Sequence, residues 1–151
     1  MPYSIRALID ADRARWQTLW DDYNRFYGRE PNEAVSLRTW ANLHDAHSSV
    51  HGIAAIDEAG RVVGIAHYII HESTSTPTPV CYLQDLYVDP DLRAGGIGKQ
   101  MIDWLIAEMG RQGWSRLYWQ TKENNYRARG LYDKYTPHSG FVRYVVANSA
   151  C

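Results

Sequence analysis

The chain has few cysteines, almost no net charge and no long apolar run. Only two cysteines, Cys81 and Cys151, occur in 151 residues. A disulfide framework of the secreted type is therefore not expected, and both thiols are predicted to be free. Sixteen Lys and Arg residues against 17 Asp and Glu residues give a net charge of −1, which offers no basic surface to DNA or RNA. We therefore expect no nucleic-acid partner.

Membrane and secretion signals are also missing from the sequence. No apolar run approaches the ~20 residues of a membrane-spanning helix, and the first residues, Met-Pro-Tyr-Ser-Ile-Arg, lack the pattern of a signal peptide. We expect no membrane partner and a cytoplasmic location. Apolar residues make up 45% of the chain and charged residues 22%, which excludes a disordered chain. The length predicts a single domain over residues 1–151.

Apolar periodicity and turn residues predict the element order β-α-α-β-β-β-α-β-α-β. Strands are expected at 4–8, 50–56, 62–70, 82–88, 115–120 and 141–146. Helices are expected from 10 to 23 or 27, at 33–43, from 97 to between 110 and 113, and at 127–135. Asn32 is the expected cap of the helix at 33–43. The Asp-Glu-Ala-Gly turn at 57–60 predicts an antiparallel hairpin, whereas the strand–helix–strand unit from 80 to 120 predicts parallel neighbours. The fold class is therefore α/β (α+β) with a mixed sheet.

A glycine-rich segment stands between a predicted strand and a predicted helix. Tyr82–Val88 is rich in aromatic and branched residues, an Asp-Pro-Asp turn follows, and helical periodicity begins at Ile97. Gly95, Gly96 and Gly98 thus fall at a helix N-terminus, where unpaired N–H groups and the helix dipole favour an anion. Glycine there allows close approach of the backbone to that anion. The segment is predicted to be a diphosphate-binding arm.

Two common nucleotide motifs do not fit this arm. A Walker A loop requires glycine at position 93 and Ser or Thr at position 100, where the chain has Arg93 and Gln100. A dinucleotide-binding fingerprint requires glycine at position 101, which is Met101. Residues 93–98 instead read R-x-x-G-x-G.

The R-x-x-G-x-G form resembles the pyrophosphate arm of the GNAT superfamily of acetyl-CoA-dependent N-acetyltransferases. The resemblance extends upstream to Leu83–Val88, which is similar to the fourth strand of that family. It extends downstream to Asn125–Tyr132, which is similar to its N-x-x-A-x-x-x-Y helix. It implies a mixed, mostly antiparallel sheet of six to seven strands with helices on both faces.

The resemblance also implies acetyl-CoA as co-substrate, held where the fourth and fifth strands splay apart and strand N–H and C=O groups lack ladder partners. The implied cofactor contacts are the strand residues Leu86, Tyr87 and Val88, the arm residues Arg93, Ala94, Gly95, Gly96, Ile97, Gly98 and Lys99, and the helix residues Asn125, Ala128 and Tyr132. No metal is expected, since the histidines at 44, 47 and 51 lack a nearby cysteine or acidic cluster.

Two residues are candidates for catalysis. Tyr132 matches the family's proposed general acid, which protonates the departing thiolate, although a tyrosine at this spacing also suits packing on the sheet. Close relatives place a carboxylate at Gln84, an amide that cannot act as a base. The general base is then Asp85, an ordered water, or no group at all if the amine arrives deprotonated. A structural role for Asp85 is an equal alternative.

The predicted function is transfer of acetyl directly to a primary amine of a small molecule, either polyamine or amino-acid-like. The alternatives are a protein lysine or N-terminal acetyltransferase and a non-catalytic acyl-CoA-binding sensor. In the family the break after the first helix borders the acceptor site, here at Tyr23, Phe26 and Tyr27, and His67 is a further candidate to line it. A homodimer is expected, since 141–146 reads as an aromatic edge strand that invites pairing.

Overall fold

The computed structural model describes residues 2–150 and falls into two compact units, divided between Gln120 and Thr121. Each unit is described by itself. The first contains β1 (Ser4–Ala7), the 3₁₀ turn η1 (Asp10–Asp12), α1 (Arg13–Phe26), α2 (Glu33–Leu43), β2 (Val50–Ile56), β3 (Val62–His71), β4 (Val80–Val88), the 3₁₀ turn η2 (Pro90–Gly95), α3 (Ile97–Gln112) and β5 (Leu117–Tyr118). The second contains α4 (Tyr126–Tyr132).

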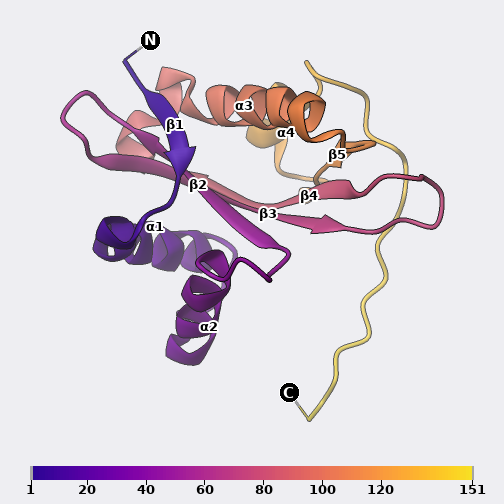
Figure 1. Ribbon diagram of the computed structural model, residues 1–151, viewed down its shortest axis with the longest axis horizontal. Helices are drawn as coiled ribbons and strands as arrows, with labels where there is room; N and C mark the ends of the chain where they lie inside the picture. The colour runs from indigo at the N-terminus through magenta and orange to yellow at the C-terminus, as the bar shows by residue number, and fades with distance from the viewer. Residues whose placement is uncertain (1, 151) are drawn as a thin grey trace. The chain divides into compact units, whose positions relative to one another are not determined.

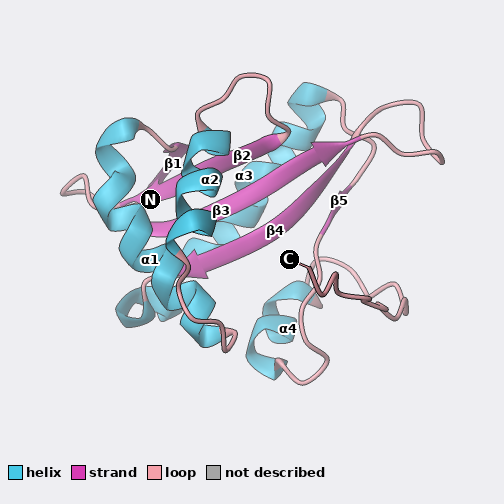
Figure 2. Ribbon diagram, turned by 90° about the horizontal axis from the view of Figure 1, so that it is seen from below, coloured by secondary structure: helices cyan, strands magenta, loops and turns pink. Residues whose placement is uncertain are grey.

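The first unit is built on a five-stranded sheet with the spatial order β1-β2-β3-β4-β5 (Figure 1). Each of the first three pairs is antiparallel, and β4 pairs with β5 in parallel. The mixed, mostly antiparallel sheet predicted from the hairpin and the crossover is therefore confirmed. In Figure 2, α1 and α2 cover one face of the sheet and α3 covers the other, as expected of helices on both faces.

The sheet faces are covered by apolar stripes at helical spacing. On one face α1 buries Trp16, Leu19, Trp20 and Tyr23, and on the other α3 buries Ile97, Met101, Ile102 and Leu105. Gly64 on β3 permits close contact with α3, since a Cβ there would lie 3.1 Å from Met101 Sδ and 3.3 Å from Ile97 Cγ2. The predicted cap of α2 is also present, because Asn32 Oδ1 accepts from Val35 N at 3.1 Å.

The prediction of six to seven strands is wrong for the described residues, which contain five. The predicted last strand at 141–146 does not form. Phe141, Tyr144 and Val146 are 92%, 90% and 98% exposed, and the segment has no ladder partner among residues 2–150. Strand propensity without a partner is not enough to make a strand. The predicted dimer edge is therefore not a strand in this structure, and dimerisation stays a prediction.

Cys81 lies fully buried in β4 with a free thiol, as predicted, and Cys151 lies outside the described residues. Within residues 2–150, no helix combines the length and the hydropathy needed to cross a membrane.

Candidate active site

The sheet opens between β4 and β5. These strands pair only through Cys81 with Leu117 and Tyr82 with Tyr118, whereas β4 runs on to Val88 with β3 as its other neighbour. The predicted fifth strand, 115–120, is thus shorter in the structure. Beyond Tyr82, no strand of the described chain pairs with β4 on the β5 side, so backbone N–H and C=O groups there are open to an extended ligand. This is the splay that the resemblance implied beside Leu86, Tyr87 and Val88.

A β-bulge in β4 marks the same region. In the β3–β4 ladder Tyr68 faces Leu83 and His67 faces Asp85, so Gln84 is an extra, unpaired residue. The bulge moves the following side chains by one position relative to the preceding ones. Asp85 therefore points to the α1 side of the sheet together with its partner His67.

Asp85 belongs to a chain of buried polar contacts under α1. Its Oδ2 lies 2.9 Å from His67 Nδ1, and the Trp16 indole N–H donates to His67 Nε2 at 2.9 Å. Trp16 and His67 are 0% and 2% exposed, while the Asp85 side chain keeps 13% exposure. The candidate base Asp85 is thus held by His67 on the α1 side of the sheet, and part of its side chain remains exposed. His67, expected to line the acceptor site, instead lies beneath Asp85.

Tyr23 borders Asp85 from α1. Its hydroxyl donates to the carbonyl of Gln84 at 3.4 Å, and its ring packs against Tyr87 at 6.0 Å. Burial, followed by the charge of Asp85 and hydrogen bonding to it, holds the pKa of the Tyr23 hydroxyl well above its usual range. Tyr23 is therefore a neutral phenol beside the Asp85 carboxylate.

Arg29 brings a positive charge to the same aromatic cluster. Its guanidinium carbon lies 5.7 Å from the Tyr23 ring centroid and 5.6 Å from that of Tyr27, and its Nε donates to Asn24 Oδ1 at 3.0 Å. Tyr23 and Tyr27, expected at the acceptor border, pack against each other with ring centroids 5.0 Å apart. Tyr23 thus lies near both the Asp85 carboxyl and the Arg29 guanidinium.

The glycine-rich arm is fixed at its start by Asp89. Asp89 Oδ1 accepts from Asp91 N at 3.0 Å and caps η2, while Asp89 Oδ2 accepts from Arg15 Nη2 at 2.5 Å. Arg15 Nε also donates to the carbonyl of Val62 at 2.9 Å. Arg15 of α1 and Asp89, the cap of η2, therefore hold the entry to the arm in place.

The end of the arm is suited to an anion. Gly96 has φ of +76° and no side chain caps α3, and a Cβ on Gly96 would meet nothing within 4 Å. The first helical backbone bond runs from Gln100 N to the Gly96 carbonyl, and the N–H groups of the first turn of a helix, here those of Ile97 and Gly98, have no acceptor within the helix. These groups fit a diphosphate.

The charged side chains of the arm have different surroundings. Arg93 lies 4.9 Å from the Tyr87 ring centroid and 5.7 Å from that of Phe26, so it links the arm to α1. Lys99 Nζ pairs with Asp103 one helical turn on, at 2.7 Å. The arm's fit to an anion therefore rests mainly on its backbone.

The remaining predicted residues lie in the second unit. Asn125 caps α4, since its Oδ1 accepts from Ala128 N at 3.3 Å, and its Nδ2 donates to Thr121 Oγ1 at 3.2 Å. Tyr132 is the last residue of α4. Because this unit is described by itself, the roles of Asn125, Ala128 and Tyr132 toward a cofactor stay predictions.

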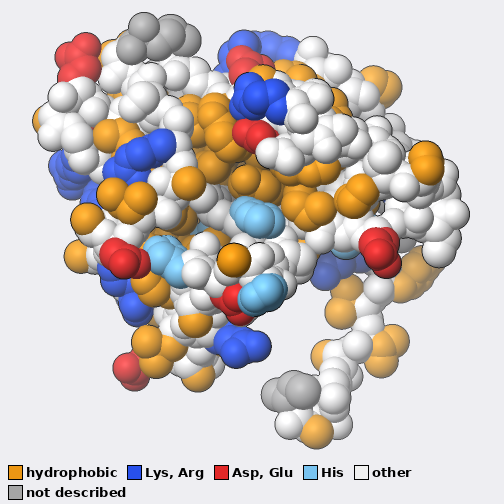
Figure 3. Space-filling model, viewed as in Figure 1, with side chains coloured by type: hydrophobic (Ala, Val, Ile, Leu, Met, Phe, Trp, Pro, Cys, Tyr) orange, Lys and Arg blue, Asp and Glu red, His pale blue; other side chains and the backbone are white. Residues whose placement is uncertain are grey.

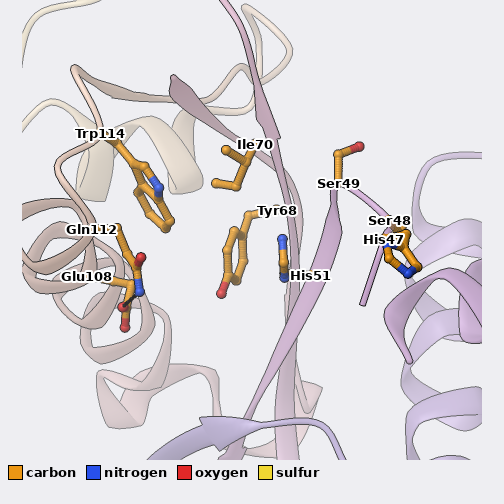
Figure 4. Close-up of a pocket in the computed structure, with 9 residues that line it drawn as sticks. All are labelled: His47, Ser48, Ser49, His51, Tyr68, Ile70, Glu108, Gln112 and Trp114. Atoms are coloured by element: carbon orange, nitrogen blue, oxygen red, sulfur yellow. Dashed lines mark hydrogen bonds between the residues drawn. The ribbon is translucent and has the colours of Figure 1, made fainter. Parts of the chain in front are cut away.

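A different pocket lies on the α3 side of the sheet (Figure 4), with a volume of about 450 Å³. Its lining residues come from the ends of β3 and α3 and from the segment entering β2: His47, Ser48, Ser49, His51, Tyr68, Ile70, Glu108, Gln112 and Trp114. Asp85 and His67 face the other side, so this pocket is separate from the candidate active site.

Surface charge around α1 and α2 is mixed. In Figure 3 basic and acidic side chains lie interspersed over these helices, with no extended area of one sign. Among residues 2–150, no group of three or more His, Cys, Asp or Glu side chains is arranged to hold a metal ion.

Sequence reasoning missed the contact of Trp16 with His67 and of His67 with Asp85. His67 was predicted only as a candidate to line the acceptor site. A partial signal was present, since His67 and Asp85 lie on two consecutive predicted strands, 62–70 and 82–88. Their pairing, however, depends on the bulge at Gln84, which strand alternation does not reveal.

Comparison with known proteins agrees with this geometry. The chain is 31% identical over 131 residues to "D-amino-acid N-acetyltransferase HPA3" of Saccharomyces cerevisiae, covering 86% of this chain and 81% of that protein. It is 28% identical to the "Uncharacterized N-acetyltransferase YhfO" of Bacillus subtilis, covering 93% and 95%. The fold matches a ribosomal-protein-alanine N-acetyltransferase from Brucella melitensis biovar Abortus, with a TM-score of 0.82, 21% identity and coverage of 97% and 99%.

The model of the acetyltransferase (GNAT) family matches residues 14–136, a range that includes α1, the bulged strand, the arm and α4. The chain is an N-acetyltransferase and belongs to the GNAT family.

Proposed function

We propose that the enzyme moves an acetyl group from acetyl-CoA directly to a primary amine of a small, amino-acid-like molecule. The observation that carries the proposal is the position of Asp85. It lies at the bulge beside the open edge of β4, partly exposed and anchored by His67 at 2.9 Å. This arrangement supplies a carboxylate next to backbone groups suited to an extended thioester substrate.

When bound, acetyl-CoA supplies a thioester whose C–S bond is exchanged for the new C–N bond. Asp85 takes the first proton from the acceptor ammonium, which frees the nitrogen lone pair for attack. Backbone N–H groups of β4 orient the thioester carbonyl, and Tyr132 donates its hydroxyl proton to the departing sulfur. The nitrogen's second proton restores Tyr132, and the proton on Asp85 leaves to solvent, so one proton is released per turnover.

The acceptor border favours an amino acid over a polyamine. Asp85 attracts an ammonium group, and Arg29, held against the rings of Tyr23 and Tyr27, attracts a carboxylate. A polyamine has no carboxylate that could pair with Arg29. The D-amino-acid N-acetyltransferase of yeast, 31% identical to this chain, supports the same choice.

Calorimetry with acetyl-CoA and an amine panel tests the proposal. We expect acetyl-CoA binding and coenzyme A release with amino acids, in preference to polyamines and lysine-containing peptides. Asp85→Asn is expected to lower kcat by roughly 10²- to 10⁴-fold, the usual contribution of a general base. Binding without turnover of any amine would support a non-catalytic sensor instead, and turnover of peptides alone would support a protein acetyltransferase.

We further propose that the enzyme works in the cytoplasm as a homodimer, as is expected of the family. Sedimentation at micromolar concentration checks the dimer, and a strictly monomeric species contradicts it.

A further inference from the structure

We infer that Trp16 and His67 are positioning residues that fix Asp85 as the proton acceptor of the reaction. The inference rests on the proposed function, in which Asp85 is the general base. It gives a role in catalysis to two buried side chains that otherwise contribute only to core packing. Trp16 Nε1, His67 and Asp85 form a continuous line of contacts, each 2.9 Å long.

The line has a fixed direction. An indole N–H can only donate, so His67 Nε2 must accept from Trp16 and carries no hydrogen. The ring's hydrogen then sits on Nδ1 and is donated to Asp85 Oδ2. Because a second hydrogen on Nε2 would point at the Trp16 N–H, the contact selects the neutral Nδ1–H tautomer of His67.

The tryptophan is itself held firmly. Its ring is fully buried and lies 6.0 Å from the Trp20 centroid and 4.8 Å from that of Trp40. Trp20 also packs edge-on against His67 at 5.0 Å. The imidazole therefore has no room to rotate, and the direction of its N–H is set by packing.

This arrangement holds one oxygen of Asp85, Oδ2, at 2.9 Å from His67 Nδ1. Three groups face the carboxylate region: His67 from β3, Tyr23 from α1 and, beyond Tyr23, Arg29 from the segment after α1. A neutral N–H donor fixes the orientation of the Asp85 carboxylate and leaves its negative charge uncompensated. An imidazolium in its place would form a full ion pair and weaken Asp85 as a base.

Two variants separate the steps of this argument. Trp16→Phe keeps an aromatic ring but removes the N–H donor to His67 Nε2, so nothing then fixes which ring nitrogen of His67 carries the hydrogen. His67→Leu removes the donor to Asp85, whereas His67→Asn retains an amide N–H near the position of Nδ1. Trp40→Phe is the matched control, since Trp40 packs on Trp16 but donates nothing to His67.

The first measurement is long-range ¹H–¹⁵N correlation of the histidine rings in the ligand-free protein. We expect His67 to show the Nδ1–H pattern in the wild type and in Trp40→Phe, and to show an Nε2–H signal in Trp16→Phe. An Nε2–H pattern in the wild type overturns the inference. This readout needs no turnover, so it is independent of the proposed function.

The second measurement is the pH dependence of kcat/KM. His67→Leu is expected to lower kcat roughly 10- to 100-fold, the equivalent of one lost hydrogen bond to a charged group, and to move the acidic limb of the profile upward. His67→Asn should recover most of that loss. Acetyl-CoA affinity is expected to be unchanged in every variant. An unshifted profile in both His67→Leu and Trp16→Phe leaves the pair purely structural and contradicts the inference.

Discussion

Arg15 and Asp89, 74 positions apart in sequence, join the first helix to the start of the glycine-rich arm. One guanidinium nitrogen of Arg15 binds Asp89 Oδ2, and its Nε binds the Val62 carbonyl. The two side chains are 22% and 14% exposed, so solvent screens the pair only in part. Through this contact α1, which carries the proposed acceptor border, also supports the arm that is proposed to bind acetyl-CoA.

Arg15→Gln is therefore expected to weaken acetyl-CoA binding by about tenfold, which corresponds to 1.4 kcal/mol of lost arm ordering. Calorimetric titration measures the affinity. The control is Arg111→Gln, which removes an arginine from a surface ion pair at the end of α3 and is expected to leave binding unchanged. Equal affinity in the wild type and Arg15→Gln would contradict a role for this pair in the arm.

Gly96 and Gly110 are a matched pair of glycines in open space, since a Cβ at either would meet nothing within 4 Å. Only Gly96 has positive φ, +76°. Gly96→Ala is expected to cost about 1–2 kcal/mol of unfolding free energy because of left-handed backbone strain. Gly110→Ala, in helical backbone, is expected to add about 0.5–1 kcal/mol. Urea denaturation measures both, and shifts of the same sign would rule out backbone strain as the reason for glycine at position 96.

Tyr132→Phe tests the proposed general acid. We expect kcat to fall by about 10²-fold, the lower end for lost acid–base catalysis, because phenylalanine has no proton for the departing sulfur. The dissociation constant for acetyl-CoA should stay near its wild-type value. Tyr135→Phe, three residues further along the chain, is the control for loss of a hydroxyl. An unchanged rate for Tyr132→Phe removes this residue from the mechanism.

Asp12 gives the fold a pH dependence. Burial acts to raise the pKa of this carboxyl, but the hydrogen bond from Arg6, the N–H of Ile9 and the charge of Arg6 outweigh it and lower the pKa below its usual value. A lowered folded-state pKa means that the stabilisation is complete above the unfolded pKa and is lost as pH falls through the folded value.

Asp12→Asn should therefore reduce the unfolding free energy by about 1–3 kcal/mol at pH 7. The difference from the wild type should shrink toward zero in acid. Asp10→Asn is a neighbouring control, since the Asp10 side chain is 94% exposed. Thermal or urea unfolding between neutral and acid pH measures the difference, and a constant gap would contradict linkage through Asp12.

Elements with a complete local signal could be predicted from the sequence. The helix after Asn32 has its cap within three residues, and the strand 50–56 is bounded by a hairpin turn, so both have the expected limits. The last two strand predictions, 115–120 and 141–146, failed for the same reason. β5 is only Leu117–Tyr118 and 141–146 is no strand, because ladder partners, rather than propensity, decide where a strand exists.

The candidate site divides in the same way. The arm could be predicted because its turn, its glycines and its helix start are adjacent in sequence. The line of contacts from Trp16 through His67 to Asp85 could not be predicted. Trp16 and His67 lie 69 and 18 residues away from Asp85 in sequence, and the line forms only after the sheet and α1 pack. The position of Arg29 could not be predicted either, because nothing local in the sequence shows that its guanidinium lies over Tyr23 and Tyr27.

The extra residue at Gln84 has a consequence for comparing this enzyme with its relatives. Side chains up to Leu83 and side chains from Asp85 onward follow opposite alternation along one strand. An alignment that places a one-residue gap on the wrong side of Gln84 would match Asp85 to a residue facing the opposite layer. During evolution, a single insertion or deletion here would exchange the whole set of β4 side chains presented to α1. Loss or gain of a base at this strand can thus arise by a length change of one residue, without any substitution at the aspartate itself.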